Sequence, residues 1–289
     1  MKNQNFGVEI ELTGITRNNV AKVIANYFGT STNHEGTNYD TYTAKDSKGR
    51  TWKVMYDGSI NTERNDSSYS VEVVTPILQY EDIEDLQEIL RQLRHNGAKA
   101  NSSCGIHIHV GAEKHTPKTL RNLVNIMASK QELIYKALDI DAGRASRYCK
   151  KLEENFVASI NRFKPSTASG IADIWYSGYS GSRNAHYNSS RYHGLNLHAV
   201  FTKGTVEFRL FNSTTHAGKL KTYIQFCLAV NNQALIQKYA SPVTTVSTNE
   251  CYTFRTWLLR LGLIGDEFKT ARKFLLENLE GDIAWRHAS

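Results

Sequence analysis

The sequence predicts an α+β fold in which one face of a sheet packs on helices and the other face is charged. Short segments with alternating apolar and polar residues are mixed with amphipathic helical segments. They follow no regular strand–helix repeat, so a β/α barrel does not fit. The 289 residues are 40% hydrophobic and 22% charged, which is enough apolar material for a sizeable core.

Alternation with period 2 marks the expected strands, and apolar residues at helical spacing mark the expected helices. Gly29 and Gly97 are helix stop signals, and Thr116 followed by Pro117 is a helix start signal. The expected strands are residues 5–13, 51–57, 69–75, 105–110, 195–200 and 205–211. The expected helices are residues 18–28, 81–96, 116–138 and 220–239.

Two segments differ from this pattern. Residues 164–190 are rich in Ser, Gly, Tyr and Asn and include Trp175, so we expect a long loop that covers a substrate, with a mobile insertion as the alternative. Leu-, Trp- and Phe-rich helical segments begin at Glu250. Because no strong linker is visible, we expect one catalytic domain over residues 1–242 and a helical extension over residues 243–289 packed on it.

Composition and sequence pattern exclude several classes of protein. There is no apolar run long enough to cross a membrane, and we expect no signal peptide, hence a cytoplasmic protein. The four cysteines are scattered, which is typical of reduced thiols. The net charge of +7 is compatible with nucleic acid or with small anions. We do not favour nucleic acid, because no dense Lys/Arg stripe accompanies the charge.

The charged residues of the expected strands share a position opposite the apolar ones. In residues 6–12, Val8, Ile10 and Leu12 alternate with two glutamates, and three other strands repeat this arrangement with glutamate, histidine or arginine. If the strands are neighbours, one sheet face is apolar and the other is lined by ionisable side chains. These side chains are Glu9, Glu11, Glu72, His107, His109, Glu207 and Arg209. On a fifth expected strand, Lys53, Met55 and Asp57 share a face.

Several carboxylates close together repel one another unless a cation lies between them. Carboxylates with imidazole suit Mg²⁺ or Mn²⁺ better than a metal that prefers thiolates. The pattern therefore predicts a divalent-metal site. Arg209 beside it would be a bidentate hydrogen-bond donor to a carboxylate or phosphate. Each pair alone has an ordinary explanation: Glu-x-Glu occurs on solvated strand faces, and Glu-x-Arg forms cross-strand ion pairs. Only the joint pattern indicates a site.

Five segments, in this order, resemble the amidoligases of the glutamine synthetase and glutamate–cysteine ligase superfamily, a group found in phages, bacteria and fungi. The resemblance extends over residues 6–235. The matching segments are FGVEIE at 6–11, DGS at 57–59, VEVVTP at 71–76, CGIHIHV at 104–110, and GLNL at 194–197 followed by TVEFRLF at 205–211. It implies a curved antiparallel sheet with helices on its convex face, and with ATP and Mg²⁺ on its concave face.

The resemblance also implies roles for particular residues. Arg209 would contact a substrate carboxylate or the transferring phosphate, Asp57 would accept a proton from the amine, and His109 would contact phosphate. Arg191 is a further anion contact. Glutamine synthetases have an arginine two residues before the last-strand glutamate, where this chain has Thr205, so a phosphate contact must come from Arg183 or Arg191. The implied metal ligands are Glu9, Glu11, Glu72, His107 and Glu207.

The predicted activity is ATP- and Mg²⁺-dependent formation of an amide or isopeptide bond, with release of ADP. The carboxylate partner is glutamyl or aspartyl, free or in a peptide or protein. The sequence identifies neither the amine substrate nor the oligomeric state. The main alternative is a metal-dependent hydrolase or nuclease, since acidic residues with His-x-His also suit hydrolysis. A binding protein without activity is the other alternative, but it gives no physical reason to keep so many like charges together.

Overall fold

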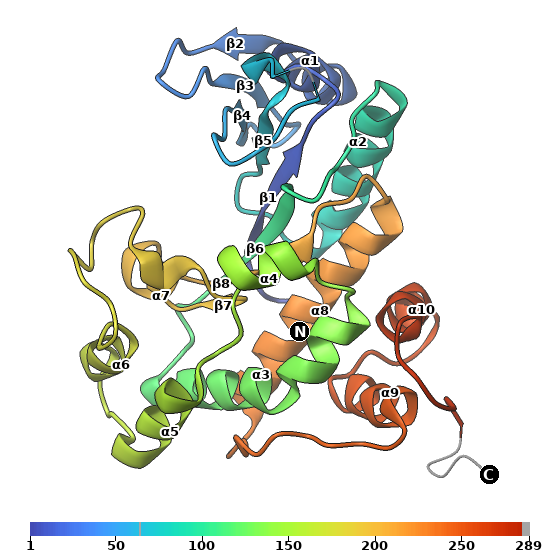
Figure 1. Ribbon diagram of the computed structural model, residues 1–289. Coiled ribbons are helices and arrows are strands. Elements are labelled where there is room, and N and C mark those ends of the chain that lie inside the picture. The colour runs from blue at the N-terminus through green and yellow to red at the C-terminus, as the bar shows by residue number, and fades with distance from the viewer. Residues whose placement is uncertain (64, 285–289) are drawn as a thin grey trace. The chain divides into compact units, whose positions relative to one another are not determined.

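The computed structural model describes residues 1–63 and 65–284 (Figure 1). The chain divides into two compact units. The sheet unit comprises Lys2–His109 and Phe211–Lys221, and the helical unit comprises Met1, Val110–Leu210 and the described chain from Thr222 onward. Antiparallel strand pairs dominate the first unit and helices dominate the second. The predicted α+β class, with an antiparallel sheet and many helices, is confirmed.

The strands of the sheet unit lie in the order β2-β3-β4-β5-β1-β6. All the pairings from β2 to β1 in this order are antiparallel. The register places Glu11 of β1 directly opposite Glu72 of β5, and Met55 of β4 on the other side of Glu72. The strands are β1 (Phe6–Leu12), β2 (Thr32–His34), β3 (Tyr42–Lys45), β4 (Thr51–Met55), β5 (Val71–Val74) and β6 (Gly105–Gly111), whose last two residues belong to the helical unit.

Two helices, α1 (Arg17–Phe28) and α2 (Ile83–His95), belong to the sheet unit; α1 packs against β3, β4 and α2. The Thr16 hydroxyl accepts a hydrogen bond from Asn19 N at the start of α1, and Gly29 ends the helix in the left-handed conformation at φ 67°. The buried apolar residues of β1, such as Val8 and Ile10, alternate with its glutamates. Burial of these residues therefore fixes the glutamates on the opposite face. Two short 3₁₀ turns, Ser67–Tyr69 and Tyr80–Asp82, precede β5 and α2.

The helical unit contains one antiparallel strand pair, β7 (Leu195–Asn196) with β8 (Thr205–Asn212), of which the last two residues belong to the sheet unit. Buried Asn122 and Asn125 on α3 donate to the carbonyl oxygens of Gln237 and Ala240. These bonds fix the chain as it leaves α8. The helices are α3 (Pro117–Ala137), α4 (Ala142–Arg147), α5 (Glu154–Phe163), α6 (Ala168–Trp175), α7 (His198–Thr202), α8 (Ala217–Ile236), α9 (Glu250–Arg260) and α10 (Lys269–Leu276), with 3₁₀ turns at Ser189–Arg191 and Asp266–Phe268. The first five residues of α8 belong to the sheet unit.

Two expected segments were wrong in part. The strand expected over residues 195–200 ends at Asn196, whose side chain accepts a hydrogen bond from His198 N and so turns the chain into α7. A short apolar run does not distinguish strand from helix, so this boundary was not visible in the sequence. The expected loop over residues 164–190 contains α6, which Thr167 caps by accepting from Gly170 N.

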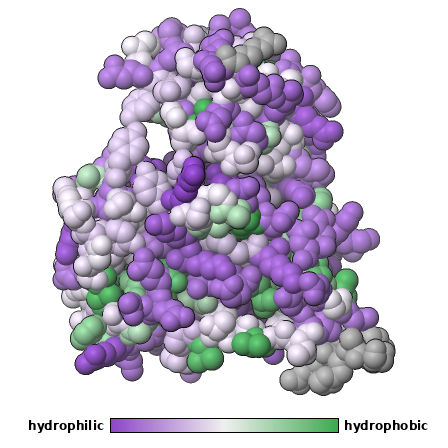
Figure 2. All heavy atoms as spheres, viewed as in Figure 1, coloured by the Kyte–Doolittle hydropathy of each residue, from purple (hydrophilic) through white to green (hydrophobic). Residues whose placement is uncertain are grey.

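Hydrophilic residues cover most of the face drawn in Figure 2, and hydrophobic ones are scattered over it. Exposed apolar residues that occur singly, such as Ile77 and Phe163, are ordinary for a folded protein. Across the residues that the structure describes, no helix is both long enough and apolar enough to span a bilayer.

Candidate metal and substrate site

Two neighbouring strands of the sheet unit present carboxylates on the same face. Glu9 and Glu11 lie two residues apart on β1, and Glu72 lies opposite Glu11 on β5. Glu11 is 4% exposed, so water does little to screen its charge from that of Glu72. Like charges directly opposite each other destabilise a strand pair. The arrangement therefore calls for a cation or for donor groups nearby.

Strand β6, the neighbour of β1, supplies such groups. The Gly105 backbone N–H donates to Glu11 Oε2 at 2.6 Å. The ring of His107 lies between two carboxylates, with Nδ1 3.0 Å from Glu9 Oε2 and Nε2 3.5 Å from Glu11 Oε1. His109 Nε2 is 3.2 Å from Glu9 Oε1. The histidines expected from the His-x-His motif are thus brought together with the glutamates of the Glu-x-Glu motif.

The charge state of Glu9 reflects this environment. Burial alone would raise the pKa of the Glu9 carboxyl, but the adjacent His109 and His107 hold it well below its usual range. Glu9 is therefore a carboxylate at neutral pH, the form that binds metals.

Two groups of donor atoms in the sheet unit have the chemistry of a divalent-metal site. One group is Glu9, Glu72 and His107, and the other is Glu11, Asp57 and Glu72; within each group the donor atoms lie within 4.8 Å of one another. Oxygen-rich sets with one imidazole suit Mg²⁺ and Mn²⁺. Glu72 belongs to both groups and would be a ligand in either of them. The residues present therefore fit the expected metal.

Asp57 follows β4 and is fixed by its backbone. Its N–H and C=O both bond the Ser70 hydroxyl, at 3.3 and 2.5 Å, and its own Oδ1 accepts from Ser59 N at 2.6 Å. Ser70 is fixed in turn by the buried Arg17, which donates to the carbonyl oxygens of Ser67 and Ser70. Arg17 therefore orders the segment between β4 and β5, which carries Asp57 and leads into the strand of Glu72.

In the helical unit, Glu207 and Arg209 form a buried ion pair on β8. Arg209 Nη1 donates to Glu207 Oε1 at 2.6 Å, and Asn196 Nδ2 donates to Glu207 Oε2 at 2.7 Å. Glu207 is 2% exposed and Arg209 5% exposed. The Arg209 guanidinium also lies over the ring of Tyr192, 6.0 Å from its centroid. Both glutamate oxygens are thus held in fixed directions.

The two other arginines named from the sequence lie on the segment between α6 and β7. Arg183 forms an ion pair with Asp173 at 2.6 Å, with both side chains at least half exposed. Arg191 donates to the His186 carbonyl oxygen at 3.1 Å and lies over the ring of Tyr187. Their expected role as anion contacts stays a prediction.

Three features of this arrangement were not expected from the sequence. Asp57 shares a donor group with Glu11 and Glu72, Asn196 orients Glu207, and Arg17 anchors the segment before β5. Asn196 lies in the GLNL segment that precedes the last strand, so the motif contained the signal. Arg17 gave no signal, because the backbone carbonyl groups and the Asp40 carboxylate that it contacts are distant in the sequence.

A family model described as "Putative amidoligase enzyme" matches residues 2–231. The chain belongs to this amidoligase family. The match includes every residue expected at the site, from Glu9 to Arg209, and family membership supports a ligase. No curated protein matches this amidoligase-family chain.

Proposed function

We propose that the protein is an ATP- and Mg²⁺-dependent carboxylate–amine ligase with a glutamine synthetase-like catalytic fold. The observation that supports this best is the acidic face of the sheet unit, where four carboxylates and His107 form two overlapping metal-donor groups. A ligase needs such a site, because ATP brings several negative charges to a carboxylate that is itself negative. The metal would neutralise this charge and align the phosphates.

The proposed reaction has two steps. An oxygen of the substrate carboxylate attacks the γ-phosphorus of ATP, forming an acyl phosphate and ADP. The amine then attacks the acyl carbon, an amide bond forms, and phosphate leaves. Such phosphoryl transfer depends on positioning and electrostatic stabilisation more than on covalent help from the protein. Fixed carboxylates and arginines of the kind described above suit that task.

The residues take the following roles in this proposal. Glu9, Glu11, Glu72 and His107 hold Mg²⁺, and Glu207 is a further ligand. Asp57, which is less buried than Glu11, accepts the proton that the ammonium nucleophile loses. Arg209 stabilises charge on the transferring group. His109, Arg183 and Arg191 contact phosphates, since Thr205 stands where glutamine synthetases have an arginine. The carboxylate is glutamyl or aspartyl, free or in a peptide or protein, and the product is an amide or isopeptide.

A thermal melt with Mg²⁺ alone, with ATP alone and with both tests the proposed site. A ligand at about 100 times its dissociation constant stabilises a native protein by about 2.7 kcal/mol, so the expected result is a clear rise in the melting temperature that needs both. A rise in the melting temperature with Mn²⁺ or Zn²⁺, and none with ATP, would contradict the ligase proposal. It would favour a metal-dependent hydrolase or nuclease.

A further inference from the structure

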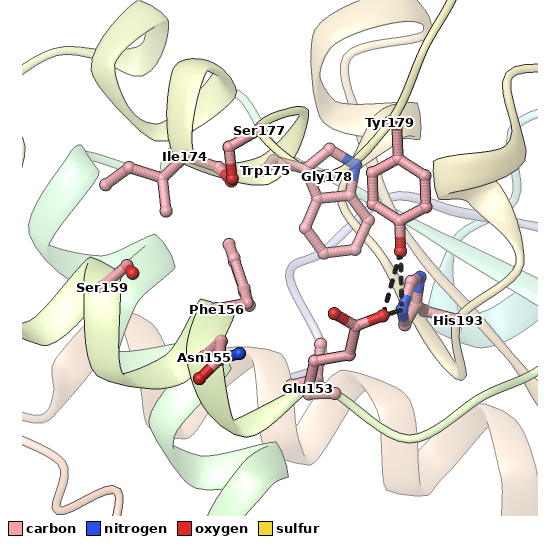
Figure 3. A pocket seen from close by; sticks show the side chains of 11 residues that line it. Glu153, Asn155, Phe156, Ser159, Ile174, Trp175, Ser177, Gly178, Tyr179 and His193 are labelled. Carbon is pink, nitrogen blue, oxygen red and sulfur yellow. Dashed lines mark hydrogen bonds and ion pairs between the residues drawn. The ribbon is translucent and has the colours of Figure 1, made fainter.

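The helical unit contains a pocket of about 250 Å³ that the ligase proposal does not use (Figure 3). It lies between the first turns of α5, the end of α6 and the segment that leads to His193. Its walls include Phe156, Trp175, Tyr179 and His193, and Glu153 stands at one side with its carboxylate pointing toward Tyr179 and His193. This space is large enough for a small organic molecule.

The aromatic rings of the pocket hold one another in place. The rings of Phe156 and Trp175 meet edge to face with centroids 5.1 Å apart, and Trp175 meets His193 in the same way at 5.2 Å. Trp175 and His193 are each 3% exposed. Rings fixed in this way have a constant geometry, and their electron-rich faces attract cations.

Hydrogen bonds define the protonation of His193 at one corner of the pocket. His193 Nδ1 lies 3.0 Å from the Ser190 carbonyl oxygen, which can only accept, so Nδ1 carries the proton. Burial lowers the pKa of His193, so the ring is neutral and Nε2 is an acceptor. The Tyr179 hydroxyl lies 3.3 Å from Nε2 and 3.5 Å from Glu153 Oε1, so these two acceptors share its one proton.

Glu153 has one donor at this corner and its side chain is 64% exposed. Its Oε1 accepts a long hydrogen bond from the Tyr179 hydroxyl at 3.5 Å and lies 4.0 Å from His193 Nε2, which has no proton to give. Burial and the Glu153 charge raise the pKa of Tyr179 to about 12, so the phenol keeps its proton. Among the described residues that line the pocket, Glu153 is the charged one, and none is lysine or arginine. The corner lacks a cationic donor.

We propose that this pocket binds a small organic cation, specifically a primary alkylammonium group. The ammonium would donate to Glu153 Oε1 and to the remaining lone pair of Tyr179 Oη, and its alkyl stem would lie against Phe156 and Trp175. A neutral alcohol of the same shape would lose the charge interaction with both Glu153 and the rings. This inference does not rest on the proposed ligase function, because it involves neither ATP nor metal.

The test is a titration of the full-length protein with n-butylammonium chloride and, separately, with 1-butanol, at equal concentrations and without ATP or Mg²⁺. Binding is followed by the NMR signal of the Trp175 indole N–H, assigned by its loss in Trp175→Phe. We expect butylammonium to bind at least about 10-fold more tightly than 1-butanol.

Glu153→Gln should weaken butylammonium binding by about 10-fold or more while leaving the weak binding of 1-butanol unchanged. Glu154→Gln is the matched control, since Glu154 is the next carboxylate along the chain and does not line the pocket. Phe156→Leu keeps an apolar wall but removes a ring, and should weaken the cation more than the alcohol. Equal binding of cation and alcohol, or unchanged cation binding in Glu153→Gln, would overturn the proposal.

Discussion

We expect Glu72→Gln to lower turnover by at least about a thousandfold while leaving the metal-free protein as stable as the wild type or more stable. Glu72 belongs to both donor groups of the sheet unit, so the substitution removes a carboxylate from each of them. Loss of about 4 kcal/mol of charge stabilisation in the transition state corresponds to this factor. Without metal, however, the change removes a like charge opposite Glu11, a gain of about 0.2–1 kcal/mol.

The measurements for Glu72→Gln are turnover with Mg²⁺ and ATP, and urea unfolding in the presence of a chelator. Glu84→Gln is the control, because Glu84 is an exposed carboxylate on α2 and its loss should change neither result. Full activity in Glu72→Gln would refute the metal assignment. A clear loss of stability without metal would show that Glu72 serves the fold instead.

The second large effect is expected at the buried ion pair of β8. Arg209→Met should destabilise the protein by about 3–5 kcal/mol, because it leaves the buried Glu207 carboxylate without the cation that now lies 2.6 Å away. Adding Glu207→Gln removes that charge and should restore much of the stability, while Asn196 can still bond the amide. Activity should remain lost in the double variant.

This pair of variants separates structure from catalysis at the site. Urea unfolding gives the free energy of each variant, and turnover is measured under conditions in which each is folded. If Arg209 and Glu207 served only the fold, the stabilised double variant would regain activity together with stability. Recovery of turnover in Arg209→Met/Glu207→Gln would therefore contradict the proposed role of Arg209 in the reaction.

The sequence predicted the charged sheet face because its signal is local. Alternation with period 2 separates Glu9 and Glu11 from the buried Val8 and Ile10, and the same rule applies to the histidines of β6. It also predicted the helices with clear start and stop signals, such as α1 and α3, to within one or two residues.

What the sequence did not reveal depends on contacts between distant segments. The place of Asp57 beside Glu11 and Glu72 is set by a turn anchored through Ser70 and Arg17, and no periodic pattern encodes that turn. The aromatic pocket likewise needed α6, which lay inside a segment that composition marked as loop. Serine and glycine are common in turns and loops, so the composition of this segment did not indicate the capped helix within it.

The most direct measurement is product analysis after incubation with Mg²⁺ and ATP. Glutamate, aspartate and glutamyl peptides would be paired with ammonia, amino acids, polyamines and a lysine peptide. The proposed function predicts ADP and, in equal amount, a product with the mass of the carboxylate plus the amine minus water, both abolished in Glu72→Gln. Cleavage of a phosphodiester or amide with metal alone, with ATP left intact, would contradict it.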